Sequence, residues 1–374
     1  MMEIKSLKEI ASLIRTGKTP PTKEDKYFNG EINWYSPGDL DKTKYLFTAK
    51  RTITQQAIED KKAITFPKDT LLVGCIGDIG KLGITSELSS SNQQLTGILP
   101  NNKTNVSYLY YWFKGNKKVL ENYSNNAVVP ILNNRTLETV KIPLPQLDQQ
   151  KKIAAILDTA DAYRQKTKAL IDKYDELTQS LFLDMFGDPV TNPKGWEPSK
   201  LGLVVENKDS KRKPVKSSDR ENMDGDYPYY GASGIIDYVN WFTHEGDNLL
   251  IGEDGANLLA RSKPIAFIAK GQYWVNNHAH VLGFNGKALL VFIEFFINLI
   301  DLSNYVTGSA QPKLNRKNMD QIKIFCPPIE LQKQFVERVQ AIKTQKAQAQ
   351  ASLAQAEDLF NSLLQRAFKG ELTS

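Results

Sequence analysis

The sequence predicts an α+β protein with two similar globular domains of mixed α/β structure, two long helices and internal pseudo-two-fold symmetry. The first observation behind this prediction is a repeat, because Leu132-Asn133 recurs as Leu314-Asn315 at an offset of 182 residues. The same offset relates many later positions without a gap, as far as Phe186 and Phe368. Since the period is the size of a domain, we interpret the repeat as a duplicated unit of domain plus helix, not as a solenoid.

The second observation is that each copy contains a long segment without proline or glycine. In both segments apolar and small residues recur at alternating steps of three and four, so that one seam faces a partner helix as in a coiled coil. We assign to this seam Ile153, Ile156, Ala160, Leu170 and Leu177 in the first helix, and Phe335, Val339, Ile342, Leu353 and Leu363 in the second.

The length of these segments suggests a spacer. A helix of about 40 residues is roughly 60 Å long, which is more than one small domain needs. We therefore interpret the two helices as a spacer that holds two domains apart. The alternative is that each helix packs only against its own domain.

The third observation is the chain length of 374 residues, which exceeds the size of a single hydrophobic core. We divide the chain into four segments: a first domain at 1–145, a central long helix at 146–187, a second domain at 188–326 and a distal long helix at 327–374.

The elements of the two domains follow a similar plan. The first domain is expected to open with a short amphipathic helix and a turn at 17–21. Its further predicted elements are a strand into a turn at 34–39, strands at 70–75, 82–85 and through Leu99, a polar loop at 90–94 and a helix at 106–113. The second domain is predicted to have an exposed aromatic loop at 227–234, strands at 248–252, 264–269, 273–275 and 281–284, a loop at 253–257 and a helix at 288–300.

Composition limits the cellular compartments and the kinds of site that are possible for this protein. The net charge is +6, and the positive surplus lies mainly on the first domain while the helices are nearly balanced. The two cysteines, Cys75 and Cys326, form neither a disulfide scaffold nor a zinc site. The N-terminus lacks the apolar stretch of a signal peptide, and the most apolar run, 288–300, is shorter than the ~20 residues that cross a bilayer. We expect a cytoplasmic protein without a membrane span.

Several kinds of catalytic site were tested against the sequence. Residues 74–82 superficially resemble a phosphate loop, but Cys75 and Leu82 stand where that motif needs Gly and Ser or Thr. There is no G-x-G-x-x-G after a strand, no N-P-P-[FYW] methyltransferase motif, and no Pro-Asp upstream of the acidic-x-Lys pairs. His278 and His280, two apart in a predicted strand, would share one face but lack a third metal ligand. We therefore predict no catalysis and no bound cofactor or metal for this chain.

The remaining chemistry is that of binding. Both domains place amide side chains in a polar loop, and Asn and Gln can pair with adenine in the major groove, while Lys and Arg pair with guanine. Each loop alone could be an ordinary turn, and the basic cluster at 211–213 could be a solvated loop. The candidate contacts are Lys81, Asn92, Gln93, Gln94, Lys211, Arg212, Lys213, Tyr229, Tyr230, Ser233, Asp254, Asn257, Asn276, Asn277, His278 and His280.

The chain resembles the DNA-specificity subunits of type I restriction–modification systems over essentially its full length. Each of the motifs that carry this resemblance is loose alone, but their order and duplication are specific. They are the paired segments 141–150 (KIPLPQLDQQ) and 323–332 (KIFCPPIELQ), 181–188 (LFLDMFGD), Gly195-Trp196, Gly17-x-Thr-Pro20, 229–234 (YYGASG), 252–257 (GEDGAN) and 274–280 (WVNNHAH).

The resemblance implies two target recognition domains, each of which reads one half of a split, asymmetric target in double-stranded DNA. It also implies that the two long helices pack antiparallel and set the spacer between the half-sites. The implied partners are two modification subunits, which hold S-adenosylmethionine and methylate adenine, and restriction subunits that translocate and cut DNA. Two alternatives stay open at this point: a coiled-coil scaffold with protein-binding domains, and a self-contained DNA-modifying enzyme.

Overall fold

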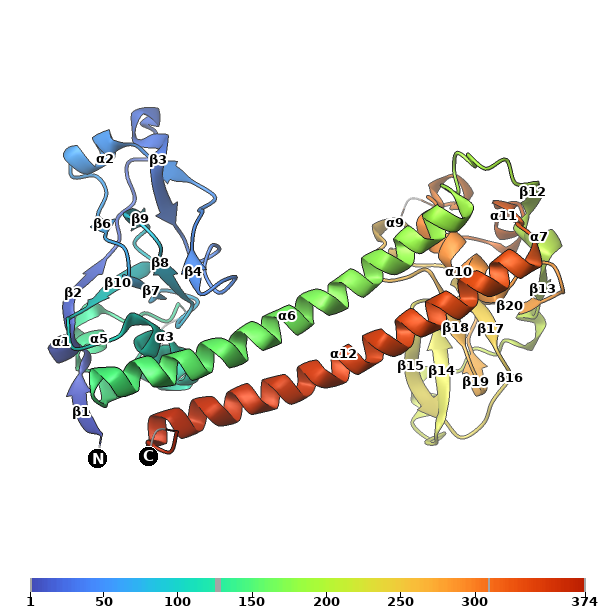
Figure 1. Ribbon diagram of the computed structural model, residues 1–374. Coiled ribbons are helices and arrows are strands. Elements are labelled where there is room, and N and C mark those ends of the chain that lie inside the picture. Colours follow the sequence, from blue (N-terminus) through green and yellow to red (C-terminus); the bar gives the residue numbers. More distant parts are fainter. Residues whose placement is uncertain (1, 125–128, 309, 373–374) are drawn as a thin grey trace. The chain divides into compact units, whose positions relative to one another are not determined.

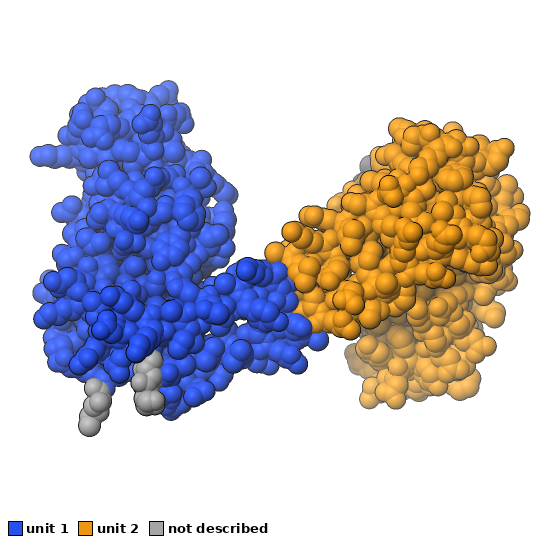
Figure 2. All heavy atoms as spheres, viewed as in Figure 1, with its two compact units in different colours: residues 1–168, 351–374 blue, residues 169–350 orange. Residues whose placement is uncertain are grey.

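The computed structural model describes residues 2–124, 129–308 and 310–372. The contacts within it divide the chain into two compact units, which Figure 2 shows in two colours. Unit 1 consists of Met1–Lys168 and Ala351–Ser374, and unit 2 consists of Ala169–Gln350. Each unit therefore contains one globular domain and part of each long helix. The four-segment division drawn from the sequence stays a prediction, because it follows the helices and not the contacts.

The two long helices are α6, at Leu147–Phe186, and α12, at Ile329–Lys369. They are 40 and 41 residues long and are the longest ribbons in Figure 1. In unit 1 the start of α6 packs on the end of α12, and in unit 2 the end of α6 packs on the start of α12. The helices therefore run antiparallel, and the α+β fold class predicted from the sequence is confirmed.

The elements of unit 1 before α6 form three sheets and several short helices among the described residues. The strands are β1 Glu3–Ser6, β2 Ala11–Thr16, β3 Phe28–Tyr35, β4 Tyr45–Leu46, β5 Thr52–Ile53, β6 Thr65–Phe66, β7 Leu71–Gly74, β8 Leu82–Thr85, β9 Ser89–Ser91, β10 Leu95–Pro100 and β11 Lys141–Leu144. The helices are α1 Leu7–Ile10, η1 Asp25–Tyr27, α2 Gln55–Glu59, α3 Val106–Gly115, α4 Lys117–Tyr123 and α5 Asn134–Thr139.

The elements of unit 2 between the long helices form three sheets of the same kinds. The strands are β12 Pro198–Lys200, β13 Val205–Asn207, β14 Tyr227–Gly231, β15 Gly234–Val239, β16 His244–Glu245, β17 Asn248–Gly252, β18 Ala266–Ala269, β19 Gln272–Val275, β20 Ala279–Phe284 and β21 Lys323–Phe325. The helices are α7 Leu201–Val204, η2 Asp209–Lys211, α8 Ser217–Arg220, α9 Asn257–Ala260, α10 Leu290–Leu299, η3 Ser303–Tyr305 and α11 Arg316–Asp320.

The two units share one topology. The largest sheet has the order β2-β10-β7-β8-β4 in unit 1, and its counterpart in unit 2 has the order β13-β20-β17-β18. A smaller sheet holds a central parallel pair, β3 with β9 in unit 1 and β14 with β19 in unit 2. A two-stranded sheet joins the start of each domain to the segment before its long helix, as β1 with β11 and β12 with β21. The pseudo-two-fold symmetry predicted from the repeat therefore extends to strand order.

One local prediction is confirmed over only four residues, and two were wrong. The N-terminal amphipathic helix is four residues long, between β1 and β2, because β1 and β2 pair with the distant strands β11 and β10. The polar loop at 90–94 begins inside the buried strand β9. The aromatic loop at 227–234 is largely strand β14, paired on both sides. In each segment, long-range strand pairing overrides the local sequence preference.

The seam of α12 faces the core more consistently than the seam proposed for α6. Ile153, Phe335 and Val339 are buried, and Ile156, Ala160, Ile342, Leu353 and Leu363 are half-buried. Leu170 and Leu177, however, expose 43% and 50% of their surface, so their assignment to the seam was wrong. A helix period of 3.6 residues turns a strict seven-residue repeat progressively away from the contact.

Two threonines occupy the buried side of α6 near those leucines. Thr167 and Thr178 expose only 7% and 8% of their surface. Their hydroxyl groups donate to the carbonyl oxygens of Tyr163 and Tyr174, at 2.9 and 2.7 Å, one helical turn earlier. Because this bond satisfies the hydroxyl inside the helix, threonine can occupy the buried side of α6.

A buried glutamine anchors each long helix to its domain. Gln150 and Gln332, at the offset of 182, are both fully buried in the first turns of α6 and α12. Gln150 Oε1 accepts the backbone N–H of Asn105 at 2.8 Å, and Gln332 Oε1 accepts that of Leu289 at 2.8 Å. Asn105 and Leu289 are the N-cap residues of α3 and α10, the buried helices of the two domains.

The amide nitrogens complete the anchor. Gln150 Nε2 donates to the carbonyl oxygens of Pro145 and Lys103, at 2.8 and 3.0 Å. Gln332 Nε2 donates to the carbonyl oxygen of Pro327 at 2.8 Å. Each side chain therefore joins the proline entry of its long helix to the start of a core helix, and it sets the direction in which the long helix leaves the domain.

We predict that Gln150→Leu loosens unit 1 locally. The substitution leaves an N–H group and two carbonyl groups without partners in a buried position, and each such group costs about 1–3 kcal/mol. Amide hydrogen exchange at the start of α3 should be faster by an amount equivalent to roughly 3 kcal/mol. The neighbouring and exposed Gln149 is a matched control, since Gln149→Leu should leave the exchange unchanged. Equal effects of the two substitutions would contradict the anchor.

Candidate nucleic-acid interface

The parallel strand pair of each unit brings two loops together at one edge. In unit 1 the N–H of Asn92, just after β9, donates to the carbonyl of Tyr35, at the end of β3, at 3.0 Å. In unit 2 the N–H of Asn276, just after β19, donates to the carbonyl of Tyr230 at 3.1 Å. We call residues 17–18, 36–39 and 92–94 the first edge, and residues 212–213, 231–234 and 276–278 the second edge.

A third segment joins each edge in the same way. The N–H of Lys18 donates to Ser91 O at 2.9 Å, and the N–H of Lys213 donates to Val275 O at 3.1 Å. Lys18 and Lys213 are exposed beside the polar loops, and the ammonium group of Lys18 donates to the carbonyl of Lys61 at 2.7 Å. The motif Gly17-x-Thr-Pro20 needs glycine at its first position, because a Cβ atom there would lie 2.2 Å from the side chain of Ser91.

The loops after β9 and β19 have the same hydrogen bonds. Asn92 Oδ1 accepts the N–H of Gln94 at 3.0 Å, and Asn276 Oδ1 accepts that of His278 at 2.8 Å. The carbonyls of Gln94 and His278 then accept the N–H groups of Cys75 and Glu253, at 2.9 and 2.8 Å. Two copies of one backbone framework therefore carry different side chains.

The amides predicted at the first edge have different environments. Asn92 is buried, and its Nδ2 donates to Gln94 Oε1 at 2.9 Å, so these two side chains bind each other. Gln93 is exposed, and its Oε1 accepts the hydroxyl of Thr19. Lys81 lies off the edge, in the turn after β7, where it pairs with Asp78 at 2.8 Å. Of these four predicted contacts, Gln93 is the one that the first edge presents to solvent.

The tyrosines predicted to contact DNA belong to the core instead. Tyr229 exposes 1% of its surface, and its hydroxyl accepts the N–H of Val215 at 3.0 Å. Tyr230 is half-buried, and its ring lies 5.5 Å from the ring of Tyr273. Their assignment to an exposed loop was wrong, because β14 lies between β15 and β19 in its sheet. Ser233, in the turn between β14 and β15, is exposed.

Asp254 and Asn257 shape the loop after β17. Asn257 Oδ1 accepts the N–H of Lys263 at 3.0 Å, and its Nδ2 donates to the carbonyl of the same residue at 3.0 Å. Asp254 forms an ion pair with His278 at 2.8 Å. Asn257 therefore closes a loop, and Asp254 holds His278 at the second edge.

The basic cluster at the second edge divides into two kinds of residue. Lys211 and Lys213 are exposed. Arg212 points inward, where its Nη1 donates to Glu253 at 2.6 Å and to the carbonyl of Ala279 at 3.0 Å. It also pairs with Asp209 at 3.3 Å. The two lysines remain available for a phosphate backbone, whereas Arg212 is bound within the protein.

His278 and His280 do not share a face, contrary to the sequence-based prediction. His278 lies in the turn before β20 and is exposed, while His280 lies within β20 and exposes 1% of its surface. His280 Nδ1 is 2.7 Å from Asp209, and Nε2 is 2.9 Å from the carbonyl oxygen of Leu314. Each ring nitrogen of His280 therefore lies within hydrogen-bonding distance of an oxygen atom inside the domain.

Asp209, Arg212, Glu253 and His280 thus form a buried charge network beneath the second edge. Burial is the largest influence on the pKa of Asp209 and raises it, but His280, the backbone N–H of Val281 and Arg212 together hold the pKa below its usual value. Burial is also the largest influence on the pKa of Glu253 and raises it, and Arg212, His280 and Lys313 together lower this pKa below its usual value. Such carboxylates stabilise the fold at neutral pH, and their contribution is lost as the pH falls through their lowered pKa values.

Among the described residues of unit 1, no such network lies beneath the first edge. Cys75 occupies the position that corresponds to Glu253 in the shared backbone framework. Burial raises the pKa of the Cys75 thiol to about 11, so the group is neutral. Sequence reasoning did not find Asp209, Glu253 or Lys18, since an acidic residue or a lone lysine in a loop carries no local pattern.

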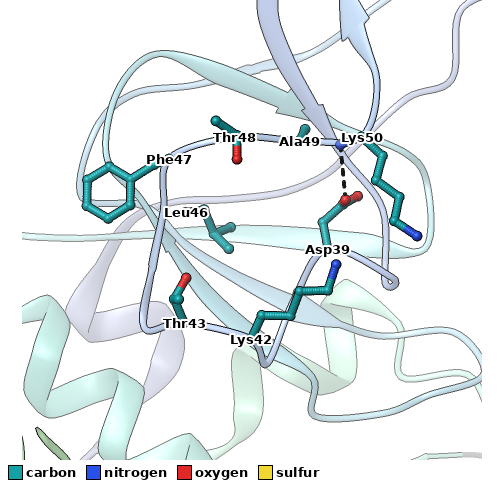
Figure 3. Close-up of a pocket in the computed structure, with 8 residues that line it drawn as sticks. All are labelled: Asp39, Lys42, Thr43, Leu46, Phe47, Thr48, Ala49 and Lys50. Carbon is teal, nitrogen blue, oxygen red and sulfur yellow. Dashed lines mark hydrogen bonds between the residues drawn. The ribbon is translucent and has the colours of Figure 1, made fainter. Parts of the chain in front are cut away.

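A shallow pocket extends the first edge. It has a volume of about 330 Å³ and follows β3, and Figure 3 shows the residues that line it. Asp39 accepts the N–H groups of Ser36 and Lys50, at 2.9 and 3.2 Å, and so closes the loop. Phe47 lies on the opposite side of the pocket from Asp39 and exposes 67% of its surface. Lys42 and Lys50 make the rim basic.

The scaffold is duplicated, and each copy presents lysine and amide side chains at the same edge. This arrangement is typical of a protein that recognises nucleic acid with two domains. Residues 1–174 and 193–357 match the family model of the type I restriction modification DNA specificity domain, and the chain belongs to this family.

Individual relatives agree with this assignment. The chain is 25% identical to the type I restriction enzyme MjaIX specificity subunit of Methanocaldococcus jannaschii, over 99% of this chain and 93% of that protein. It is 38% identical to a putative type I restriction enzyme specificity subunit of Haemophilus influenzae, over 39% of this chain and 37% of that protein.

Solved structures share the fold. The S subunit of a type I restriction-modification system from M. genitalium aligns with a TM-score of 0.64 at 16% identity, over 98% of this chain and 96% of that chain. A chain from a structural study of type I complex assembly aligns with a TM-score of 0.60 at 16% identity, over 99% and 98% of the two chains. Within the described residues, no helix is both long and apolar enough to span a membrane.

We predict that His280→Leu destabilises unit 2. The change removes both hydrogen bonds of the buried imidazole, to the Asp209 carboxylate and to the carbonyl oxygen of Leu314, and each buried polar group that loses its partner costs about 1–3 kcal/mol. Hydrogen exchange of β17 and β20 in the full chain should accelerate accordingly. The control is His278→Leu, which removes an ion pair at a half-exposed position and should cost less than about 1 kcal/mol. If both variants behaved alike, the network would have no special role.

Proposed function

We propose that this chain is the DNA-specificity subunit of a type I restriction–modification complex, in which each unit reads one half of a split, asymmetric target. The observation that carries the proposal is the pair of edges with one backbone framework and different exposed side chains. Identical frameworks would approach DNA in the same way. Different side chains would then read different bases, so the two half-sites would differ in sequence.

Each unit is proposed to divide its contacts by type. Lys211 and Lys213 at the second edge, and Lys18 at the first, would position the domain on phosphates. The exposed polar side chains beside them, Gln93, Ser233 and Asn277, would reach base edges. The network of Asp209, Arg212, Glu253 and His280 would support the second edge from below without touching DNA.

The partners follow from family membership. The chain is a non-catalytic subunit, and we propose that it docks two modification subunits and, in the full complex, restriction subunits. S-adenosylmethionine would be bound by the modification subunit, and adenine methylation and DNA cleavage would belong to the assembled complex. Leu170 and Leu177, which α6 exposes two turns apart, offer an apolar surface for such docking. We place the complex in the cytoplasm.

Exchange of one domain tests the proposal. Residues 188–326 would be replaced by the same segment of another family member, and the hybrid would be expressed with the modification subunits. We expect methylome sequencing to show one new half-site beside one unchanged half-site. Loss of both half-sites, or no change in either, would contradict one reader per domain. Salt-dependent DNA binding of the wild-type complex would distinguish it from a protein-binding scaffold, and methylation by the chain alone would indicate an enzyme.

A second prediction concerns the helices. Insertion of one heptad into both α6 and α12 adds about 10 Å of helix, which corresponds to roughly three base pairs of duplex. We expect the methylated motif to keep both half-sites while the spacer lengthens by about that number. Inserting the heptad into α6 alone is the control, because the two helices would no longer match and methylation should fall. A variant that altered a half-site would argue against the spacer role.

A further inference from the structure

The turns after β9 and β19 each present one amide side chain next to a buried asparagine. The buried residue is Asn92 in unit 1, which exposes 7% of its surface, and Asn276 in unit 2, which exposes 4%. The Oδ1 atom of each asparagine accepts the N–H two residues later, at 3.0 and 2.8 Å, so the residue between is held at the tip of the turn. The tip residues are Gln93 and Asn277, and both are exposed.

The other amides of these turns have partners inside the protein. Asn92 and Gln94 bind each other through Nδ2 and Oε1 at 2.9 Å. Asn276 is buried, and the carboxamide that remains at the second edge is that of Asn277. In the part of the chain that the structure describes, no protein group forms a hydrogen bond with the side chain of Asn277. Of the amide side chains in each turn, the tip residue is therefore the exposed one.

The side chain of Gln93 is oriented by Thr19. The hydroxyl of Thr19 donates to Gln93 Oε1, which keeps one further lone pair for another donor. The Nε2 group of Gln93 faces solvent with no described protein acceptor. The carboxamide therefore offers a donor and an acceptor side by side, in an orientation set before DNA arrives. This pre-organisation lowers the entropy that binding would cost.

A carboxamide that offers a donor and an acceptor side by side matches adenine. In the major groove adenine presents the N7 acceptor beside the N6 amino donor, and Asn or Gln binds both at once. Lys18 and Lys213, whose backbone N–H groups bond to the last residues of β9 and β19, would supply a positive charge for the adjacent phosphate. Cytosine and thymine each lack one of the two groups in the major groove, so they would pair less well.

We propose that Gln93 and Asn277 are matching adenine-reading residues, one for each half-site. This inference rests on the proposed function and narrows its base contacts to one side chain in each unit. It requires that each half-site contain an adenine whose readout depends on its own tip residue, independently of the other half.

The test uses the complete chain with its modification subunits and methylome sequencing. We expect Asn277→Ala to make one adenine position of one half-site degenerate, with roughly a ten- to hundredfold loss of preference for adenine there. Gln93→Ala should do the same in the other half-site. Asn277→Asp keeps the size of the side chain but replaces the donor with an acceptor, so the preference at that position should shift towards cytosine.

Controls separate the outcomes. Asn240→Ala removes an exposed amide of unit 2 that lies off the second edge and should leave the motif unchanged. An unchanged motif in Asn277→Ala would overturn the proposal, and so would degeneracy in both halves. If an assembled variant complex methylated no site at all, the residue would serve assembly and not reading, which also overturns it. Failure of the wild-type complex to methylate any bipartite motif would instead refute the proposed function.

Discussion

The hydrogen bonds of Gln150 and Gln332 are the constraint on which the rest of the structure depends. Each glutamine joins the first turn of a long helix to the N-cap of a buried domain helix, with contacts of 2.8 Å on both amide atoms. A long helix keeps a fixed direction relative to its domain only if its first turn is held rigidly. Because both anchors lie at the same position of the repeat, the two domains hold their helices in the same manner, and the pseudo-symmetry follows from this shared joint.

On this framework the two units diverge in how they support their edges. Unit 2 places the largely buried network of Asp209, Arg212, Glu253 and His280 beneath its loops, whereas unit 1 has a neutral thiol at the position that corresponds to Glu253. Unit 1 instead adds the segment between β3 and β5, with its basic pocket and exposed Phe47. The backbone geometry of the edges is the same in both units, because it is built from main-chain hydrogen bonds and from an asparagine side chain that both turns share, Asn92 in unit 1 and Asn276 in unit 2.

The fold class could be predicted from the sequence because its signals are long. A gapless offset of 182 residues and two segments without proline or glycine leave little room for another architecture. The individual contacts could not be predicted, because they depend on pairings between distant segments. Tyr229 looked exposed beside its glycines, yet two neighbouring strands bury it. Asn92 and Gln93 are neighbours of the same chemistry, and only the three-dimensional turn separates the structural amide from the free one.

Leu170 and Leu177 bear on the stability of the isolated chain. Both leucines face water on α6, and apolar area left in water raises the free energy of the isolated molecule by about 25 cal/mol for each Å². A modification subunit that docked on this surface, as proposed above, would remove this apolar area from water, so that assembly would stabilise the chain as well as place its partner.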